Sequence, residues 1–232
     1  MFINGFDILW DEIDDYVADI KSIRSIDQFT FTKPVTFFCG ENGSGKSTLL
    51  EALAIKNGLN PEGGTRNYNF STYDSYSNLH KHMRLWRSRK PDWMYFLRAE
   101  SFYNVATKEM EYSGVFSERY HDQSHGQSFF SVLMKQTNKN GLYLLDEPEA
   151  ALSCQNQLAL LYLIQSCVKQ NCQFIIATHS PILLGFPNAQ ILSFDEDKVE
   201  EVDYKSTSSY QTMKLFLDRY DYFVEDIKEN EI

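Results

Sequence analysis

The nine residues GENGSGKST (40–48) constrain this chain more than any other stretch of its sequence. They fit the pattern G-x-x-x-x-G-K-[ST], and they lie between a run rich in Phe, Val and Thr and an apolar run with helical spacing. Glycines let the backbone curl around an anion, so that its N–H groups and the start of the following helix point at the charge. We therefore predict a strand, a phosphate-binding loop and a helix in this order.

The residue types in this loop indicate a nucleoside triphosphate as ligand. We expect Lys46 to reach the β- and γ-phosphates and the Ser47 hydroxyl to bind Mg²⁺. A chance glycine-rich turn is the alternative, and the flanking strand and helix patterns disfavour it. The candidate ATP-binding residues of the loop are Gly40, Glu41, Asn42, Gly43, Ser44, Gly45, Lys46, Ser47 and Thr48.

Two acids follow a second apolar run, in LYLLDEPEAALS (142–153). The run predicts a buried strand whose carboxyl end brings Asp146 beside the phosphate loop, where it can hold Mg²⁺ through water. Glu147 points to the other side of the strand axis, so it is free to accept a proton from an attacking water. Both acids could instead simply end a strand at the surface, but the phosphate loop favours the catalytic interpretation.

A third buried run, FIIATHSP, places His179 just after a strand. The strand end should lie on the same edge of the sheet as Asp146 and Gly40. A lone histidine there is more often structural; beside a phosphate loop we expect it to contact the γ-phosphate or the attacking water. The predicted catalytic residues are therefore Glu147, His179 and Lys46, and the predicted metal ligands are Ser47 and Asp146.

Strands alternating with helices predict an α/β fold with a mostly parallel sheet, because parallel strands buried on both faces read as continuous apolar runs. Residues 1–20 fit either a short helix or an irregular edge, and residues 60–78 resemble a loop. We expect strands at 30–39, 93–99, 141–147 and 173–178, helices at 46–58, 79–90, 127–136 and 153–169, a hairpin at 189–204 and a last helix at 210–220.

Composition narrows the class of protein further. Apolar residues make up 43% of the 232-residue chain, which indicates a globular fold, and no run approaches the length of a membrane helix. The acidic start is unlike a signal peptide, and four cysteines without metal-ligand spacing suggest a reducing compartment, so we expect a cytoplasmic protein with no membrane insertion. The formal charge of -10 disfavours a wholly basic nucleic-acid binder.

The order of these motifs resembles that of the ATP-binding cassette ATPases. In that family a loop written L-S-G-G-Q, at a helix N-terminus, caps the γ-phosphate held by the other subunit. QSHGQ (123–127) matches it at Ser124, Gly126 and Gln127, which the resemblance implies as ATP-binding residues, while Gln123 and His125 depart from it. A plain N-capping serine at Ser124 is the alternative.

The resemblance covers about residues 40–195. It implies a P-loop NTPase fold of the ABC-ATPase type with a C-terminal hairpin and helix, as one domain over 1–232 with a helical and loop insertion at about 58–123. The chain looks closest to soluble single-domain ATPases related to the chromosome-maintenance (SMC) and recombinational-repair ATPases. Transporter subunits carry an Arg-rich helix after the signature and a metal-sensing Gln, whereas this chain has SFFSVLMKQ and offers Glu100, whose role stays open.

The resemblance implies a soluble ATPase that hydrolyses ATP with Mg²⁺ in a nucleotide-sandwich homodimer. The alternatives are the energy subunit of a membrane transporter and a nucleotide-gated dimerising module with negligible turnover that recruits another protein; the presence of Glu147 favours the enzyme. The cluster HKHMRLWRSRKPDW (80–93) has basic and aromatic residues compatible with nucleic-acid binding, although a solvated helix face explains it more simply. The adenine contact should be an aromatic or Arg among the first 30 residues.

Overall fold

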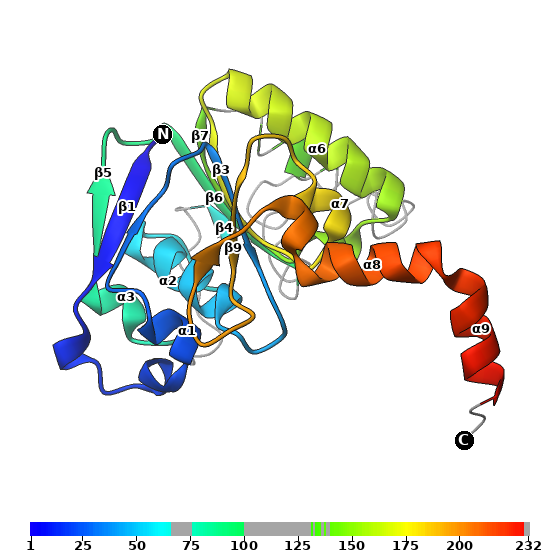
Figure 1. Cartoon of the computed structure of the whole chain (residues 1–232). Helices are drawn as coiled ribbons and strands as arrows, with labels where there is room; N and C mark the ends of the chain where they lie inside the picture. Colours follow the sequence, from blue (N-terminus) through cyan, green and yellow to red (C-terminus); the bar gives the residue numbers. More distant parts are fainter. Residues whose placement is uncertain (66–75, 100–130, 132, 136, 138–139, 230–232) are drawn as a thin grey trace.

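The computed structural model describes residues 1–65, 76–99, 131, 133–135, 137 and 140–229 (Figure 1). Its strands are β1 (Ile3–Ile8), β2 (Gln28–Thr30), β3 (Val35–Cys39), β4 (Gly64–Thr65), β5 (Met83–Arg87), β6 (Trp93–Arg98), β7 (Gly141–Asp146), β8 (Gln173–Ala177), β9 (Gln190–Ser193) and β10 (Glu200–Glu201). Its main helices are α1 (Lys21–Arg24), α2 (Lys46–Lys56), α3 (Leu79–His82), α6 (Cys154–Lys169), α7 (Pro181–Leu184), α8 (Ser208–Asp218) and α9 (Tyr220–Glu229). Short 3-10 turns lie at Trp10–Glu12, Tyr16–Asp19, Pro148–Ala151 and Tyr204–Ser206.

A seven-stranded sheet in the order β10-β9-β3-β8-β7-β6-β4 forms the centre of the molecule. The five strands from β9 to β6 run parallel, and only the outermost pairs, β10 with β9 and β4 with β6, are antiparallel. The predicted α/β fold with a mostly parallel sheet is confirmed. β6 lies within the range 58–123 that we expected as an insertion, and it is a strand of this sheet.

Alternate residues of the buried strands pack on opposite faces of the sheet, as the strand repeat requires. Leu142 and Leu144 of β7 belong to a core that includes α2 and the first strands, whereas Tyr143 and Leu145 belong to a core that includes α6 and α7. Figure 1 shows α2 and α6 on opposite sides of the sheet. The helices that follow β3 and β7 thus cover the two faces, and the loops that lead into them start from one edge.

A separate antiparallel sheet, in the order β2-β1-β5, corrects our prediction for residues 79–90. Only Leu79–His82 is helical; Met83–Arg87 is strand β5, paired along β1. The Trp86 indole Nε1 donates to Asp7 Oδ2 at 2.8 Å, so a side-chain hydrogen bond adds to the backbone pairing of β5 with β1. Pairing with a strand about 80 positions away overrode a local sequence that reads equally well as a helix.

The C-terminal part begins with the predicted hairpin, β9 and β10, and continues into α8 near the predicted position. A further helix, α9, follows it, and neither α8 nor α9 has a buried residue. Figure 1 shows the two helices extending away from the body of the molecule. The other expected elements in the described residues, α2, β6, β7, α6 and β8, are confirmed. The strand expected at 30–39 is β3 only over Val35–Cys39, because Thr30 ends β2 of the small sheet. The helix expected at 127–136 lies largely outside the described residues.

A buried glutamine on the large sheet hydrogen-bonds to the first strand of the small sheet. The amide of Gln173, at the start of β8, is fully buried; its Oε1 accepts from the backbone N–H groups of Phe2 at 2.7 Å and Ile3 at 3.0 Å, and its Nε2 donates to the Ile3 carbonyl at 2.8 Å. Because these backbone groups are buried, they depend on the Gln173 amide for hydrogen bonds.

We expect Gln173→Leu to lower the free energy of unfolding by about 3 kcal/mol, because it keeps the bulk but removes the partner of buried polar groups. Denaturant unfolding measures the loss, and Gln155→Leu, on the exposed side of α6, is the matched control with little change. Equal stabilities of the two variants would contradict this role.

Candidate functional site

The register of the parallel strands brings the predicted site residues to one edge of the large sheet. Phe38, Ala177, Asp146 and Arg98 lie side by side on β3, β8, β7 and β6. Just beyond this row the backbone N–H of Glu147 still donates to the Ala177 carbonyl at 2.9 Å, before the strands turn into their loops. The phosphate loop, the acids after β7 and the histidine after β8 therefore leave the sheet together.

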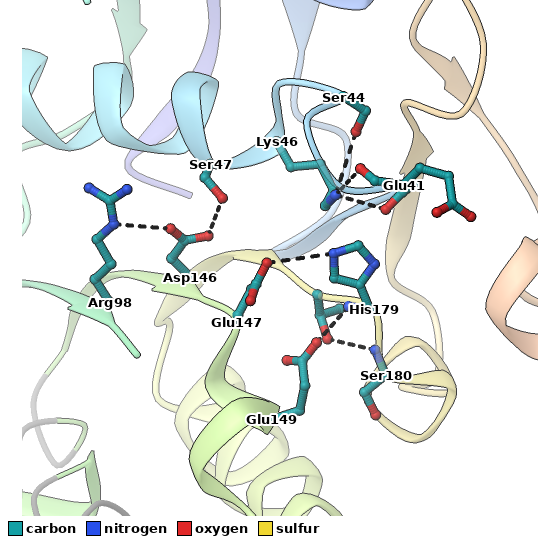
Figure 2. Close-up of polar contacts among 12 residues, drawn as sticks. Glu41, Ser44, Lys46, Ser47, Arg98, Asp146, Glu147, Glu149, His179 and Ser180 are labelled. Carbon is teal, nitrogen blue, oxygen red and sulfur yellow. Dashed lines mark hydrogen bonds and ion pairs between the residues drawn. The ribbon is translucent and has the colours of Figure 1, made fainter. Parts of the chain in front are cut away.

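The loop between β3 and α2 closes around its own lysine. Lys46 Nζ donates to the carbonyl oxygens of Gly40 and Glu41, both at 2.7 Å, and lies 3.5 Å from Ser44 Oγ (Figure 2). The curled backbone matches the predicted phosphate-binding loop, and α2 begins at Lys46. Asn42 and Glu41 are exposed on the outer side of the loop.

The ammonium of Lys46 is almost fully buried, with 3% of the residue exposed. Desolvation by burial lowers its pKa, and the carboxylates of Glu147, Asp195 and Asp146 oppose this shift. A buried cation held among carbonyls and acids is directed at the inside of the loop, where an anionic ligand would meet it.

Ser47 and Asp146 meet across the gap between α2 and β7. The Ser47 hydroxyl donates to Asp146 Oδ1 at 2.9 Å, so the two predicted metal ligands lie in direct contact (Figure 2). A hydroxyl and a carboxylate oxygen are the donors that Mg²⁺ takes beside nucleotide phosphates, with water filling the remaining positions. The residues present fit Mg²⁺ of this kind; among the described residues, no cluster of three or more His, Cys, Asp or Glu side chains forms a protein-only metal site.

Arg98 is a site residue that our sequence analysis missed. Its Nε lies 3.5 Å from Asp146 Oδ2, and its Nη1 donates to Glu51 Oε2 at 2.5 Å. Burial raises the pKa of Glu51, and the Arg98 guanidinium opposes that shift. The signal in the sequence was a cation at the end of an apolar strand, and the fold places it in register with Asp146.

Glu147 and His179 face each other over the edge of the sheet. His179 Nε2 lies 3.5 Å from Glu147 Oε1, and both side chains are partly exposed, at 36% and 40% (Figure 2). Glu147 has a left-handed backbone with φ of 49°, which takes its side chain out of the strand's alternation. The His179 backbone N–H donates to Glu149 Oε1 at 2.5 Å, so this second acid, which we did not predict, anchors the histidine loop.

A tyrosine and a cavity lie near the phosphate loop, and the sequence did not single out either of them. Tyr16 lies with its hydroxyl near the side chains of Thr48 and Ser77, and burial together with the Glu51 carboxylate raises its pKa. On the other side, a cavity of about 540 Å³ is lined by Gly40, Glu41 and His179 and by residues of α8 and α9, including Phe216 and Phe223. The C-terminal helices thus border the candidate site.

The remaining predicted residues, Ser124, Gly126, Gln127 and Glu100, lie outside the described residues. The structure therefore brings together Lys46, Ser47, Asp146, Glu147 and His179, and the signature loop stays a prediction. Among the described residues, no helix is both long and apolar enough to cross a bilayer.

Comparisons with known proteins agree with this geometry. Models described as an AAA domain and an AAA ATPase domain match residues 17–84 and 125–184. An uncharacterized ABC transporter ATP-binding protein of Haemophilus influenzae is 27% identical over 196 residues, covering 73% of each chain. The cytochrome c biogenesis ATP-binding export protein CcmA of Rhizobium etli is 30% identical over 171 residues, covering 66% of this chain and 78% of CcmA. This chain belongs to the ATP-binding cassette ATPases.

Solved structures show the same fold. An inward-facing putative metal-chelate type ABC transporter superposes with a TM-score of 0.52 at 17% identity, covering 91% of this chain and 88% of that one. An Smc head bound to the C-winged helix domain of ScpA gives a TM-score of 0.50 at 14% identity, covering 87% and 98%. The fold is thus shared with transporter ATPases and SMC heads. The match to an AAA ATPase domain and the ABC relatives identify the chain as an enzyme that binds and hydrolyses ATP.

The left-handed glycines of the loop differ in what surrounds them. A Cβ on Gly45, at φ of 97°, would lie 2.8 Å from Ile23 and 2.9 Å from Ile20, whereas a Cβ on Gly43, at φ of 79°, would meet nothing within 4 Å. Both substitutions carry backbone strain, but only the one at Gly45 adds a clash.

We expect Gly45→Ala to lower the free energy of unfolding by about 1–3 kcal/mol more than the matched variant Gly43→Ala. Denaturant unfolding of the two variants measures the difference. Equal losses would show that Ile20 and Ile23 do not restrict the space beside Gly45.

Proposed function

We propose that this ATPase works as a cytoplasmic homodimer in which two copies enclose two ATP·Mg²⁺ and separate after hydrolysis. The observation that carries the proposal is the convergence of Lys46, the Ser47–Asp146 pair and the Glu147–His179 pair at one sheet edge. Phosphoryl transfer needs positioning and charge stabilisation more than covalent help, and these residue types supply both.

Binding of the triphosphate is assigned to the loop and its lysine. Loop N–H groups and the start of α2 attract the phosphates, and Lys46 exchanges its carbonyl partners for β- and γ-phosphate oxygens. Ser47 and Asp146 would hold Mg²⁺, which when bound neutralises charge on the β- and γ-phosphates. Tyr16, which is about half exposed as a residue (53%) and whose hydroxyl lies near Thr48, is our candidate for the adenine contact.

Proton transfer is assigned to Glu147. A water in line with the γ-phosphate would donate its proton to this carboxylate, while His179 donates a hydrogen bond to the γ-phosphate. Glu149 supports this arrangement, because it holds the backbone of His179 in place. The presence of an acid at position 147 favours a turning-over enzyme over a purely nucleotide-gated binding module.

The exposure of the catalytic pair supports the need for a second copy. The side chains of Glu147 and His179 are 40% and 36% exposed, so water still reaches part of this pair. Hydrolysis of a bound triphosphate benefits from a closed, preorganised site. We assign the closing role to Ser124, Gly126 and Gln127 of the other copy, whose hydroxyl and N–H groups suit a γ-phosphate.

The energy subunit of a membrane transporter is the second candidate. It is favoured by the names of the relatives, a transporter ATP-binding protein and an export protein. Purification of the chain at its native expression level distinguishes the two, since a transporter subunit should be recovered with membrane proteins and the proposed homodimer should not.

We expect Glu147→Gln to bind ATP with wild-type affinity, to hydrolyse it about 100-fold more slowly or worse, and to accumulate as a dimer. The amide keeps the shape of the side chain but cannot accept the proton. Steady-state turnover and light scattering with ATP·Mg²⁺ measure the two effects, and Glu225→Gln on the exposed α9 is the control. A variant that stays monomeric would contradict the sandwich.

The signature loop is tested by mixing two inactive variants. Lys46→Ala should abolish ATP binding in a folded chain, and Ser124→Arg should spare binding but prevent dimerisation and hydrolysis. In a mixed dimer, each site combines the phosphate loop of one copy with residues 124–127 of the other. One site therefore carries both substitutions and the other carries neither, so we expect the mixture to recover ATPase activity that neither variant has alone.

Two outcomes would contradict this assignment to different degrees. If mixed dimers are shown to form but no ATPase activity returns, then either the signature loop serves its own subunit or both sites must be intact for hydrolysis. Wild-type activity in Ser124→Arg alone would reject the signature role of residues 124–127.

A further inference from the structure

The carboxylate of Asp146 is engaged from two sides. Ser47 Oγ donates to Oδ1 at 2.9 Å, while Arg98 Nε lies 3.5 Å from Oδ2 (Figure 2). The side chain of Asp146 is only 6% exposed, so protein groups rather than solvent surround its carboxylate. One oxygen thus faces the phosphate-loop serine, and the other faces Arg98.

Arg98 also binds a second acid. Its Nη1 contacts Glu51 Oε2 at 2.5 Å, and the Glu51 side chain is 11% exposed. Glu51 lies four residues after Ser47 on α2, which places both side chains on one face of the helix, one turn apart. The guanidinium therefore lies between two carboxylates, one on the helix that follows the phosphate loop and one on β7.

We propose that Arg98 is a positioning residue for the metal site: by engaging Asp146 Oδ2 and Glu51 together, it leaves Asp146 Oδ1, beside Ser47, as the carboxylate oxygen that Mg²⁺ meets. The inference rests on the proposed function, which assigns Ser47 and Asp146 to the metal. It adds a residue on β6, a strand to which the motifs gave no role.

The shape of the guanidinium explains why an arginine suits this place. Its planar fork carries several N–H donors at fixed angles, so one group can bind two carboxylates at once, which a lysine ammonium does less well. Held in this way, Asp146 presents one carboxylate oxygen to the metal position. The other positions around Mg²⁺ are then left for water and phosphate oxygens, which this ion prefers. Groups that orient a metal ligand typically change metal affinity about 10–100-fold when they are removed.

The test compares Arg98→Met with Arg84→Met, a change at an exposed arginine of β5. Two quantities are measured: the half-saturating Mg²⁺ concentration for turnover, and the ATP affinity by calorimetry with and without Mg²⁺. We expect Arg98→Met to raise the half-saturating Mg²⁺ about tenfold, to lose the Mg²⁺-dependent gain in ATP affinity, and to leave metal-free ATP affinity within about twofold. An unchanged Mg²⁺ requirement overturns the inference.

Two further variants exclude a general structural effect. Arg98→Lys keeps the charge and decides the case if Arg98→Met does not fold; we expect it to raise the Mg²⁺ requirement several-fold, and a wild-type value overturns the inference. In Arg98→Met/Glu51→Gln the shift should persist. A return to the wild-type Mg²⁺ requirement there would mean that Arg98 merely neutralises Glu51, which also overturns it.

Asp146→Asn separates this inference from the proposed function. If Asp146→Asn leaves the Mg²⁺ requirement unchanged, the assignment of the metal site fails, and the role of Arg98 fails with it. If Asp146→Asn raises the requirement while both Arg98 variants do not, the metal site stands and only the positioning role of Arg98 is rejected.

Discussion

The hydrogen-bond register of four parallel strands is the constraint on which the rest of this structure depends. It aligns Phe38, Ala177, Asp146 and Arg98 across the sheet, so the segments that follow β3, β8 and β7 leave the sheet at one edge. A shift of one residue in any strand would turn its core side chains to the wrong face. The same packing that buries the core therefore fixes the relative positions of the phosphate loop, the two acids and the histidine.

The buried charges at this edge of the sheet must also be balanced by neighbouring charges of opposite sign. Lys46 is buried, and carboxylates around it keep its ammonium from being isolated in the interior. Arg98 does the same for Asp146 and Glu51. Because an unpaired buried charge is strongly destabilising, cations and carboxylates must alternate here, and such an arrangement is also suited to binding a polyanion and its metal ion.

Prediction from the sequence succeeded where local pattern and burial agree, and failed where partners are distant. The strand before Gly40, the helix from Lys46, and the strands ending at Asp146 and Ala177 were all expected from apolar runs and flanking turns. The segment Met83–Arg87 was expected as a helix, because its pairing with β1 is invisible locally. Arg98 and Glu149 were missed for a related reason: their roles come from contacts with Asp146 and with the His179 backbone, not from a motif.

The sequence by itself determined the fold class and the phosphate loop, and it pointed to Asp146, Glu147 and His179 as candidates near that loop, since glycine spacing, apolar runs and a strand-ending acid are local requirements of the chemistry. Only the tertiary structure decided which strand lies beside which, and with it the contacts of Ser47 with Asp146, of Glu147 with His179, and of Arg98 with two acids. The reason is physical: a strand's apolar pattern says that it is buried, but its neighbours are chosen by hydrogen-bond pairing and packing across the whole chain.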